Sequence, residues 1–154
     1  MKIDIGAGNI TEDGWTKLDP VHGQGEWKRK AEETPWPIGD NEVEELRASH
    51  VMEHIHAGQD RISVMNEAYR VLQPGGTFEI IVPLIVARNA GEQLGWWAIA
   101  DPTHVSYWVE ESFHYFDGHF AANADYSIKI WETVKLDVEA GWEGHWVGKK
   151  PFDG

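Results

Sequence analysis

Two glycines one residue apart follow a short apolar stretch near the start of the chain. They are Gly6 and Gly8, in the run Asp4-Ile5-Gly6-Ala7-Gly8-Asn9. Glycine tolerates positive φ and carries no Cβ, so a ligand can approach such a backbone closely. Asp19 ends the next predicted strand, where a carboxylate can accept hydrogen bonds from both ribose hydroxyls of an adenosine. The pattern therefore predicts an adenosine-containing ligand beside Gly6, Gly8 and Asp19.

The spacing after Gly8 separates two classes of such ligands. A dinucleotide fingerprint has a third glycine and a helix whose N-terminus binds pyrophosphate. This chain has Thr11 at the third-glycine position, and Gly8 to Trp15 leaves room for barely one helical turn. S-adenosylmethionine carries no phosphate and needs no such helix, so the spacing favours it over a nicotinamide cofactor. The same shortness is unusual, because connections between parallel strands take about a dozen residues or more.

Histidines and a glutamate occupy two later segments. His50, Glu53 and His54 lie within five residues, and His104 follows much later. Such side chains can take a proton from a reacting group within hydrogen-bond reach. We therefore predict Glu53, His54 and His104 as catalytic residues, with Glu53 and His54 as a general base or an acceptor-binding pair. The histidines could also bind a metal, but hydrogen-bonded histidines are commoner, and we predict no metal.

Alternating strands and crossovers must position these residues. Strands are expected at Lys2–Ile5, Trp15–Asp19, Val43–Ser49, Thr77–Val82, Ile128–Val138 and Gly144–Lys149, and helices at Asp60–Leu72 and Val109–Phe116. This order predicts one α/β domain over residues 1–154, with a Rossmann-like, mostly parallel sheet and an antiparallel C-terminal hairpin. Ligands of such sheets lie beyond the carboxyl ends of the strands. Gly6, Asp19 and the turn from Ser49 to His54 all fall there.

The segment from Leu84 to Asp117 is long, irregular and aromatic. It contains Trp96, Trp97, His104, Tyr107, Trp108, Tyr115 and Phe116. A long segment without regular structure is usually functional in a compact domain. Its rings either stack on a flat or sugar-like acceptor or bury themselves and hold the segment in place, and both interpretations stay open.

Composition narrows the partners. Thirteen basic against 26 acidic residues give a net charge of −13, which repels phosphate backbones and anionic membranes. The only basic run, Lys28-Arg29-Lys30, is short, so we expect neither nucleic acid nor membrane as partner. The absence of cysteine excludes disulfides and thiolate sites. No long apolar stretch is present near Met1 or elsewhere, and we expect a cytoplasmic protein.

Four motifs, in this order, resemble the class I S-adenosylmethionine-dependent methyltransferases. They are DIGAGN, GWTKLDP, TPWPIGDNEVEELRASHVMEHI and the helix ending in YRVLQPGGTFEIIVP, over residues 3–83, with a looser likeness in DPTHVSYWVEESFHYF. The chain is most similar to small members with a shortened first crossover. The resemblance implies S-adenosylmethionine as cofactor and a seven-stranded sheet with a reversed last strand.

The resemblance also implies which residues contact the cofactor. They are Asp4, Gly6, Ala7, Gly8, Asp19, Ala31, Glu32, His50 and Val51. The first four match the loop under the methionine part, and Asp19 matches the ribose-binding acid. His50 and Val51 match the residues that face the cofactor after the fourth strand of the family. Ala31 and Glu32 match the segment beside the adenine. Lys30 stands where the family often has an acid for the adenine amino group, which leaves backbone groups or Glu32 for that role.

The resemblance implies a methyltransferase, and our lead hypothesis for its acceptor is a small molecule or a glycan. Methylation of a nucleobase amino group is not favoured, because the chain has no Asn-Pro-Pro-Tyr type motif. Two alternatives come from other classes. One is a non-catalytic cofactor-binding or interaction module that keeps the fold, which the small size and Lys30 favour. The other is a nicotinamide oxidoreductase, which the missing third glycine disfavours.

Overall fold

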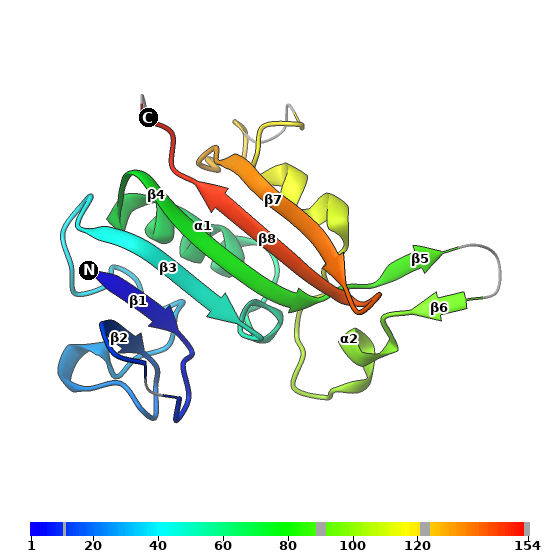
Figure 1. The fold of residues 1–154 in the computed structure, drawn as a ribbon, viewed down its shortest axis with the longest axis horizontal. Coiled ribbons are helices and arrows are strands. Elements are labelled where there is room, and N and C mark those ends of the chain that lie inside the picture. The colour runs from blue at the N-terminus through cyan, green and yellow to red at the C-terminus, as the bar shows by residue number, and fades with distance from the viewer. Residues whose placement is uncertain (11, 89–91, 121–123, 153–154) are drawn as a thin grey trace.

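A six-stranded sheet forms the centre of the molecule (Figure 1). The computed structural model describes residues 1–10, 12–88, 92–120 and 124–152. The strands are β1 Lys2–Ile5, β2 Trp15–Leu18, β3 Val43–Ser49, β4 Leu72–Pro83, β7 Glu132–Glu139 and β8 Glu143–Lys149, in the order β2-β1-β3-β4-β8-β7. Neighbours among β1 to β4 are parallel, and β8 is antiparallel to both β4 and β7. The predicted α/β class, parallel sheet and C-terminal hairpin are confirmed.

The expectation of seven strands is wrong for the described residues. Beyond β2 the sheet has no further strand, and β2 is its edge. The residues between β2 and β3 form loops and one short 3-10 helix, η1 Gly25–Trp27. Trp36 holds this segment against the later helix that contains Glu67, and not at the edge of the sheet. Its backbone N–H donates to the Glu67 side chain, and its indole N–H donates to the Ala31 carbonyl. Prolines 35 and 37 flank Trp36 and have no N–H for a strand ladder.

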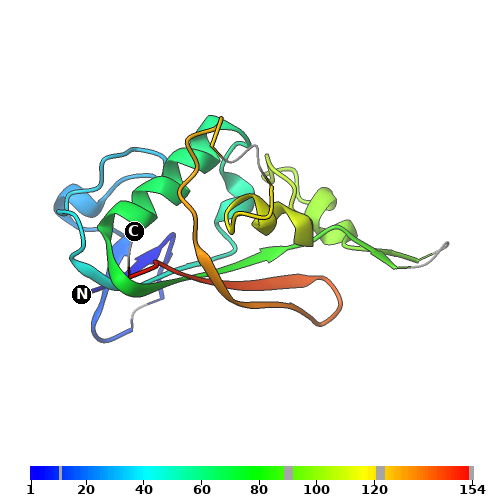
Figure 2. The same cartoon turned by 90° about the horizontal axis from the view of Figure 1, so that it is seen from above.

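One helix, α1 Gln59–Val71, packs over one face of the sheet (Figure 2). Its buried residues include Val64, Met65, Ala68 and Val71, which recur at helical spacing. The largest fully buried side chains on this side are aromatic: Trp108, Trp131, Trp146, Phe78 and Phe113. The helix ends at Val71, and the chain continues directly into β4.

The other face of the sheet has no helix over it within the described residues (Figure 2). It carries ion pairs between strands, such as Lys2 with Glu45 and Arg47 with Asp4. Parallel sheets ordinarily have both faces covered. Here residues 6–14, which join β1 to β2, contain no helix in their described part, so the first crossover leaves this face open.

The segment from Leu84 to Asp117 is more regular than predicted. It contains a hairpin of β5 Val86–Arg88 and β6 Glu92–Leu94, the short helix α2 Trp96–Ala100 and the 3-10 helix η3 Glu110–Tyr115. Residues 89–91 of this segment lie outside the described residues. Some of its aromatic rings are buried and hold the segment in place, and others are exposed and could contact an acceptor. Trp108 is buried against Phe113, whereas Trp96 and Trp97 stack on each other and are half exposed.

Several boundaries differ from the predicted ones. β7 begins at Glu132 rather than at residue 128, and the predicted short helix after Val109 is a 3-10 helix. Ile128 and Trp131 are buried before the strand starts, so apolar residues that pack in a loop resembled the start of a strand. Among the described residues, no helix has the length and apolar character needed to span a membrane.

Candidate active site

The loop after β1 is shaped by its two glycines. Gly6 and Gly8 have φ values of 65° and 56°, in the left-handed region that favours glycine. A Cβ on Gly6 would come within 2.4 Å of a methyl carbon of Val51, which follows β3. The backbone N–H of Gly6 donates to the carbonyl of Leu18, at the end of β2. The glycine loop, the end of β2 and the turn after β3 are therefore held together.

Asp19 is buried and already holds the backbone around it. Its carboxylate accepts hydrogen bonds from the N–H groups of Gly8 at 3.0 Å, Val21 at 2.8 Å and His22 at 2.7 Å. Burial alone would raise the pKa of Asp19, but these three hydrogen bonds outweigh it and lower the pKa. A carboxylate offers about four lone-pair sites. One therefore stays available for a ligand.

A cleft of about 480 Å³ lies beside this loop, on the open face of the sheet. Among the predicted cofactor residues, Asp4, Gly6, Ala7 and His50 line it. Three others do not line the cleft but lie in the loops around it. Gly8 donates to Asp19, and Val51 lies against Gly6.

Ala31 and Glu32 are not among the residues that line the cleft. Ala31 is buried, and its carbonyl accepts the indole N–H of Trp36. The carbonyl of Glu32 accepts the backbone N–H of Thr34, in the same turn. The structure thus brings most of the predicted cofactor residues together and leaves this pair in the loop before Trp36.

Arg47 lines the cleft and was not anticipated from the sequence. Its guanidinium donates to Asp4 at 2.7 Å and also pairs with Glu12, and it stacks over Trp15. The hydrogen bonds that the guanidinium donates to these two carboxylates raise its pKa above the ordinary arginine range. The only sequence signal was a basic residue at a polar position of β3, which does not identify its partner 43 residues away.

Glu53 is the most buried acid of the turn that follows β3. It lies in the 3-10 helix η2 Met52–His54, and only 1% of its surface is exposed. Its Oε1 atom lies 3.4 Å from Nδ1 of His50 and 4.0 Å from Nε2 of His104, while Oε2 has no hydrogen-bond partner among the described residues. A buried carboxylate oxygen without a partner is costly, which is typical of a functional position.

His54 and His104 are oriented by backbone carbonyls. Nδ1 of His54 lies 3.1 Å from the carbonyl of Thr103, and Nδ1 of His104 lies 2.9 Å from that of Ala98. Carbonyl oxygens only accept, so each Nδ1 carries a proton, and in the neutral form of each ring Nε2 has the lone pair. The two rings meet edge to face with centroids 5.0 Å apart. Sequence reasoning expected Glu53, His54 and His104 to act together, and the structure places them in one cluster.

Two further properties define this cluster, which consists of Glu53, His54 and His104. Their nearest ligand atoms all lie within 4.8 Å of one another, a spacing that also suits a metal ion, so the absence of a metal stays a prediction. The hydrogen bond with Glu53 is the largest cause of a raised pKa at the neighbouring His50, with Glu143 adding to it against the effect of burial. The cluster can accept a proton or hold a polar group.

Comparison with known proteins agrees with this architecture. Residues 17–80 match the family model described as a methyltransferase domain. A S-adenosylmethionine-dependent methyltransferase from Archaeoglobus fulgidus has a TM-score of 0.65 at 13% identity, over 97% of this chain and 85% of that chain. The chain has the class I methyltransferase fold. The resemblance inferred from the sequence is therefore confirmed.

Two other methyltransferase structures have the same fold. The 1,6-didemethyltoxoflavin-N1-methyltransferase of Burkholderia thailandensis, solved with 1,6-didemethyltoxoflavin and S-adenosylhomocysteine, has a TM-score of 0.62 at 15% identity, over 97% of this chain and 70% of that chain. A chain of the Haloferax volcanii complex between the Trm112 methyltransferase activator and a protein described as a methyltransferase has a TM-score of 0.60 at 14% identity, over 97% and 82%. No curated protein sequence matches this methyltransferase-like chain.

Proposed function

We propose that the chain is a S-adenosylmethionine-dependent methyltransferase that acts on a small-molecule or glycan acceptor. The observation that carries this proposal is the pairing of two features at one edge of the sheet. One is a glycine loop too tight for a side chain at Gly6. The other is the cluster of Glu53, His54 and His104, in which a buried carboxylate oxygen lacks a partner among the described residues.

The residues at the carboxyl ends of β1 to β3 fit the proposed cofactor. The backbone of Gly6 and Gly8 leaves space for the methionine part, and the remaining lone-pair site of Asp19 can accept a ribose hydroxyl. When bound, S-adenosylmethionine supplies an electrophilic methyl group. What the chain must add is position, together with removal of a proton where the acceptor has one to lose.

Glu53, His54 and His104 are proposed to receive that proton. Nε2 of either histidine has its lone pair free of the carbonyl bonds that hold Nδ1. Glu53 stabilises the imidazolium that forms on His104, because its Oε1 atom lies 4.0 Å away. The acceptor would lie between this cluster and the exposed Trp96 and Trp97 rings, which suit a flat or sugar-like molecule. The net charge of −13 disfavours a nucleic-acid acceptor.

Methyl transfer from labelled S-adenosylmethionine to a panel of phenols, hydroxy acids and oligosaccharides tests this role. Glu53→Gln, His54→Ala and His104→Ala are expected to lower turnover by about 10²-fold or more, the usual contribution of a general base. They should keep affinity for S-adenosylhomocysteine within about twofold. His119→Ala is the matched control, because this exposed histidine lies outside the cluster. Full turnover in all three variants, or a loss of cofactor affinity in all three, would reject the proposed role.

A second candidate function is a non-catalytic module that keeps the fold. The observation that favours it is that the Asp19 carboxylate already accepts hydrogen bonds from three backbone N–H groups. One similar structure is a complex with an activator protein, so a protein partner is compatible with this fold. Binding of S-adenosylhomocysteine without transfer to any acceptor of the panel would favour the module over the enzyme.

A further inference from the structure

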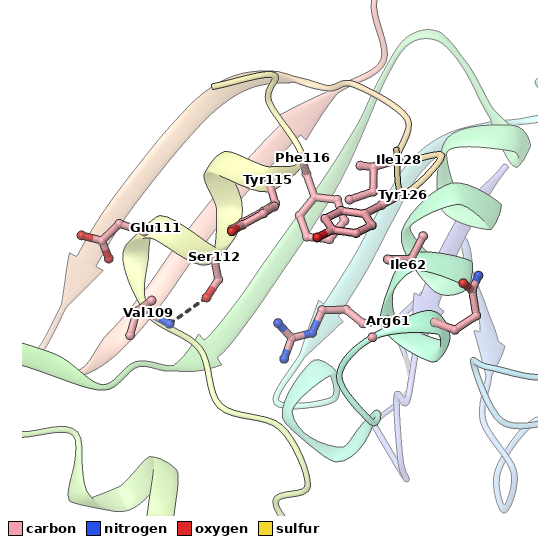
Figure 3. A pocket seen from close by; sticks show the side chains of 11 residues that line it. Arg61, Ile62, Val109, Glu111, Ser112, Tyr115, Phe116, Tyr126 and Ile128 are labelled. Carbon is pink, nitrogen blue, oxygen red and sulfur yellow. Dashed lines mark hydrogen bonds between the residues drawn. The ribbon is translucent and has the colours of Figure 1, made fainter. Parts of the chain in front are cut away.

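A second cavity lies on the side of the sheet that carries α1. It has a volume of about 520 Å³ and opens between the first turn of α1 and the helix η3 (Figure 3). Its walls are mostly apolar and include Ile62, Tyr115, Phe116, Tyr126 and Ile128. None of its lining residues lines the cleft beside the glycine loop, and none belongs to the cluster of Glu53, His54 and His104. It is therefore a separate site.

Arg61 is the one basic residue among those that line this cavity. No carboxylate of the described residues pairs with it, and its Nε is buried without a partner. Among the described residues, the only hydrogen bond of its guanidinium is a long one, from Nη2 to the carbonyl of Tyr107 at 3.5 Å. Burial lowers the pKa of Arg61 to about 10. Arg47 and Arg70, by contrast, each pair with two carboxylates.

Trp108 fixes the orientation of this guanidinium. The central carbon of the Arg61 guanidinium lies 3.9 Å from the centre of the Trp108 ring, and Trp108 is fully buried. A guanidinium that stacks on an indole through its face keeps its N–H groups in its own plane. Those N–H groups can then bind an anion with two parallel hydrogen bonds. A charge held in place and left without an anion is the arrangement expected of a binding site.

The acid that lines the cavity does not neutralise Arg61. Glu111 is exposed, and Figure 3 shows its carboxylate directed away from Arg61. Ser112 has a neutral hydroxyl, which accepts the backbone N–H of Val109 at 3.0 Å (Figure 3), so it supplies no counter-charge either. The remaining walls are aromatic and aliphatic. The cavity therefore combines one unpaired cation with a surface suited to a flat, apolar body.

We propose that this cavity binds a small aromatic molecule that carries an anionic oxygen group. Arg61 binds the carboxylate or phosphate, and Tyr115, Phe116 and Tyr126 contact the ring. Its volume of about 520 Å³ lies within the usual range of small-molecule sites. The site does not depend on the methyl-transfer function, because its residues are distinct from those of the glycine-loop cleft.

Calorimetric titration with three matched probes tests the site on the unaltered chain. The probes are 2-naphthoate, 2-naphthyl phosphate and the neutral 2-naphthamide. At least one anion is expected to bind about tenfold or more tightly than the amide, the factor for a lost charge-assisted hydrogen bond. The anion that binds more tightly identifies the group that the site prefers. Equal affinity for the amide and both anions, or no binding of any probe, would overturn the proposal.

Variants then test whether the positive charge that binds the anion is that of Arg61. Arg61→Gln should weaken binding of the anion about tenfold and leave the amide unchanged, because only the anion uses the guanidinium. Lys129→Gln is the matched control, since it removes one positive charge from an exposed residue next to Ile128 and should have no effect. Undiminished binding of the anion by folded Arg61→Gln protein would place the ligand elsewhere. If that variant does not fold, the comparison of anion and amide on the unaltered chain still decides the matter.

Discussion

The two faces of the central sheet are built by different physical means. Along β4, Phe78, Ile80 and Val82 are fully buried on the side of α1, whereas Glu79 points to the open side and lies 2.5 Å from His145. The first face is stabilised by apolar burial and the second by ion pairs between strands. The chain thus keeps one half of a doubly wound fold, and the covered face must supply most of its stability.

Two neighbouring residues of the C-terminus make the same contrast. The ammonium group of Lys150 turns to the covered side, where it donates to Asn41 at 2.6 Å, to the Tyr69 carbonyl at 2.8 Å and to that of Leu72 at 2.9 Å. Lys149 turns to the open side and pairs with Glu132 at 2.8 Å. One lysine is buried with all three donors satisfied, and the other is partly exposed to solvent. The contribution of each lysine to the free energy of unfolding therefore depends on its place in the fold and not on its residue type.

The largest expected effect comes from the covered face. Trp146 is fully buried, stacks on Phe113 and donates its indole N–H to Thr133. Trp146→Ala leaves a cavity and should lower the free energy of unfolding by about 3–5 kcal/mol. Urea denaturation followed by circular dichroism measures this. A loss below about 1 kcal/mol would mean that the covered face is not the main source of stability.

The lysine pair gives the next largest effect and contains its own control. Lys150→Met leaves two carbonyls and an amide oxygen without their donor, and we expect a loss of about 1–3 kcal/mol in the free energy of unfolding. Lys149→Met removes a solvated pair and should cost about 0.5 kcal/mol or less. Equal losses in the two variants would contradict the contrast between the faces.

The smallest expected effect is a pH dependence on the open face. Burial lowers the pKa of His145, but hydrogen bonds to Glu139 and Glu79 outweigh it, and the net pKa is raised. Protonated His145 therefore stabilises the fold below its ordinary pKa of about 6.5, and this contribution is lost as pH rises through the raised value.

Comparison of the unaltered chain with His145→Gln measures the pH-dependent contribution of His145 to the free energy of unfolding. The difference in the free energy of unfolding between the two proteins should shrink from pH 6 to pH 8. His50, whose pKa is also raised, is present in both proteins and cancels. A difference that is constant or that grows with pH would show that His145 is not stabilised as a cation in the folded state.

Short-range patterns predicted the elements, and long-range contacts decided what the patterns left open. β1 and β3 begin and end where the sequence placed them, and α1 lies within one residue of its predicted bounds. The hairpin of β5 and β6 was missed, because its two strands are only three residues each and carry no alternation. The lack of a strand beyond β2 could not be anticipated either, because Trp36 is anchored to Glu67, 31 residues away.

Some residues of the candidate sites could be predicted from the sequence, and others could be found only from the structure. Residue types with known chemistry identified Glu53, His54 and His104, and the structure brings them together. Arg61 and Arg47 were missed, because an arginine on a helix or strand is usually a solvated residue. Their roles depend on what lies opposite: Trp108 for Arg61 and Asp4 for Arg47. Sequence spacing contains no information about such partners.

Calorimetric titration of the purified chain with S-adenosylhomocysteine and with NAD tests the central claim most directly. The described residues of the short loop after Gly8 form no helix for a pyrophosphate, and Asp19 has one lone-pair site left for a ribose hydroxyl. We predict that S-adenosylhomocysteine binds more tightly than NAD, and that Asp19→Ala weakens its binding by about 1.5–3 kcal/mol. Tighter binding of NAD, or no binding of S-adenosylhomocysteine, would contradict the assignment.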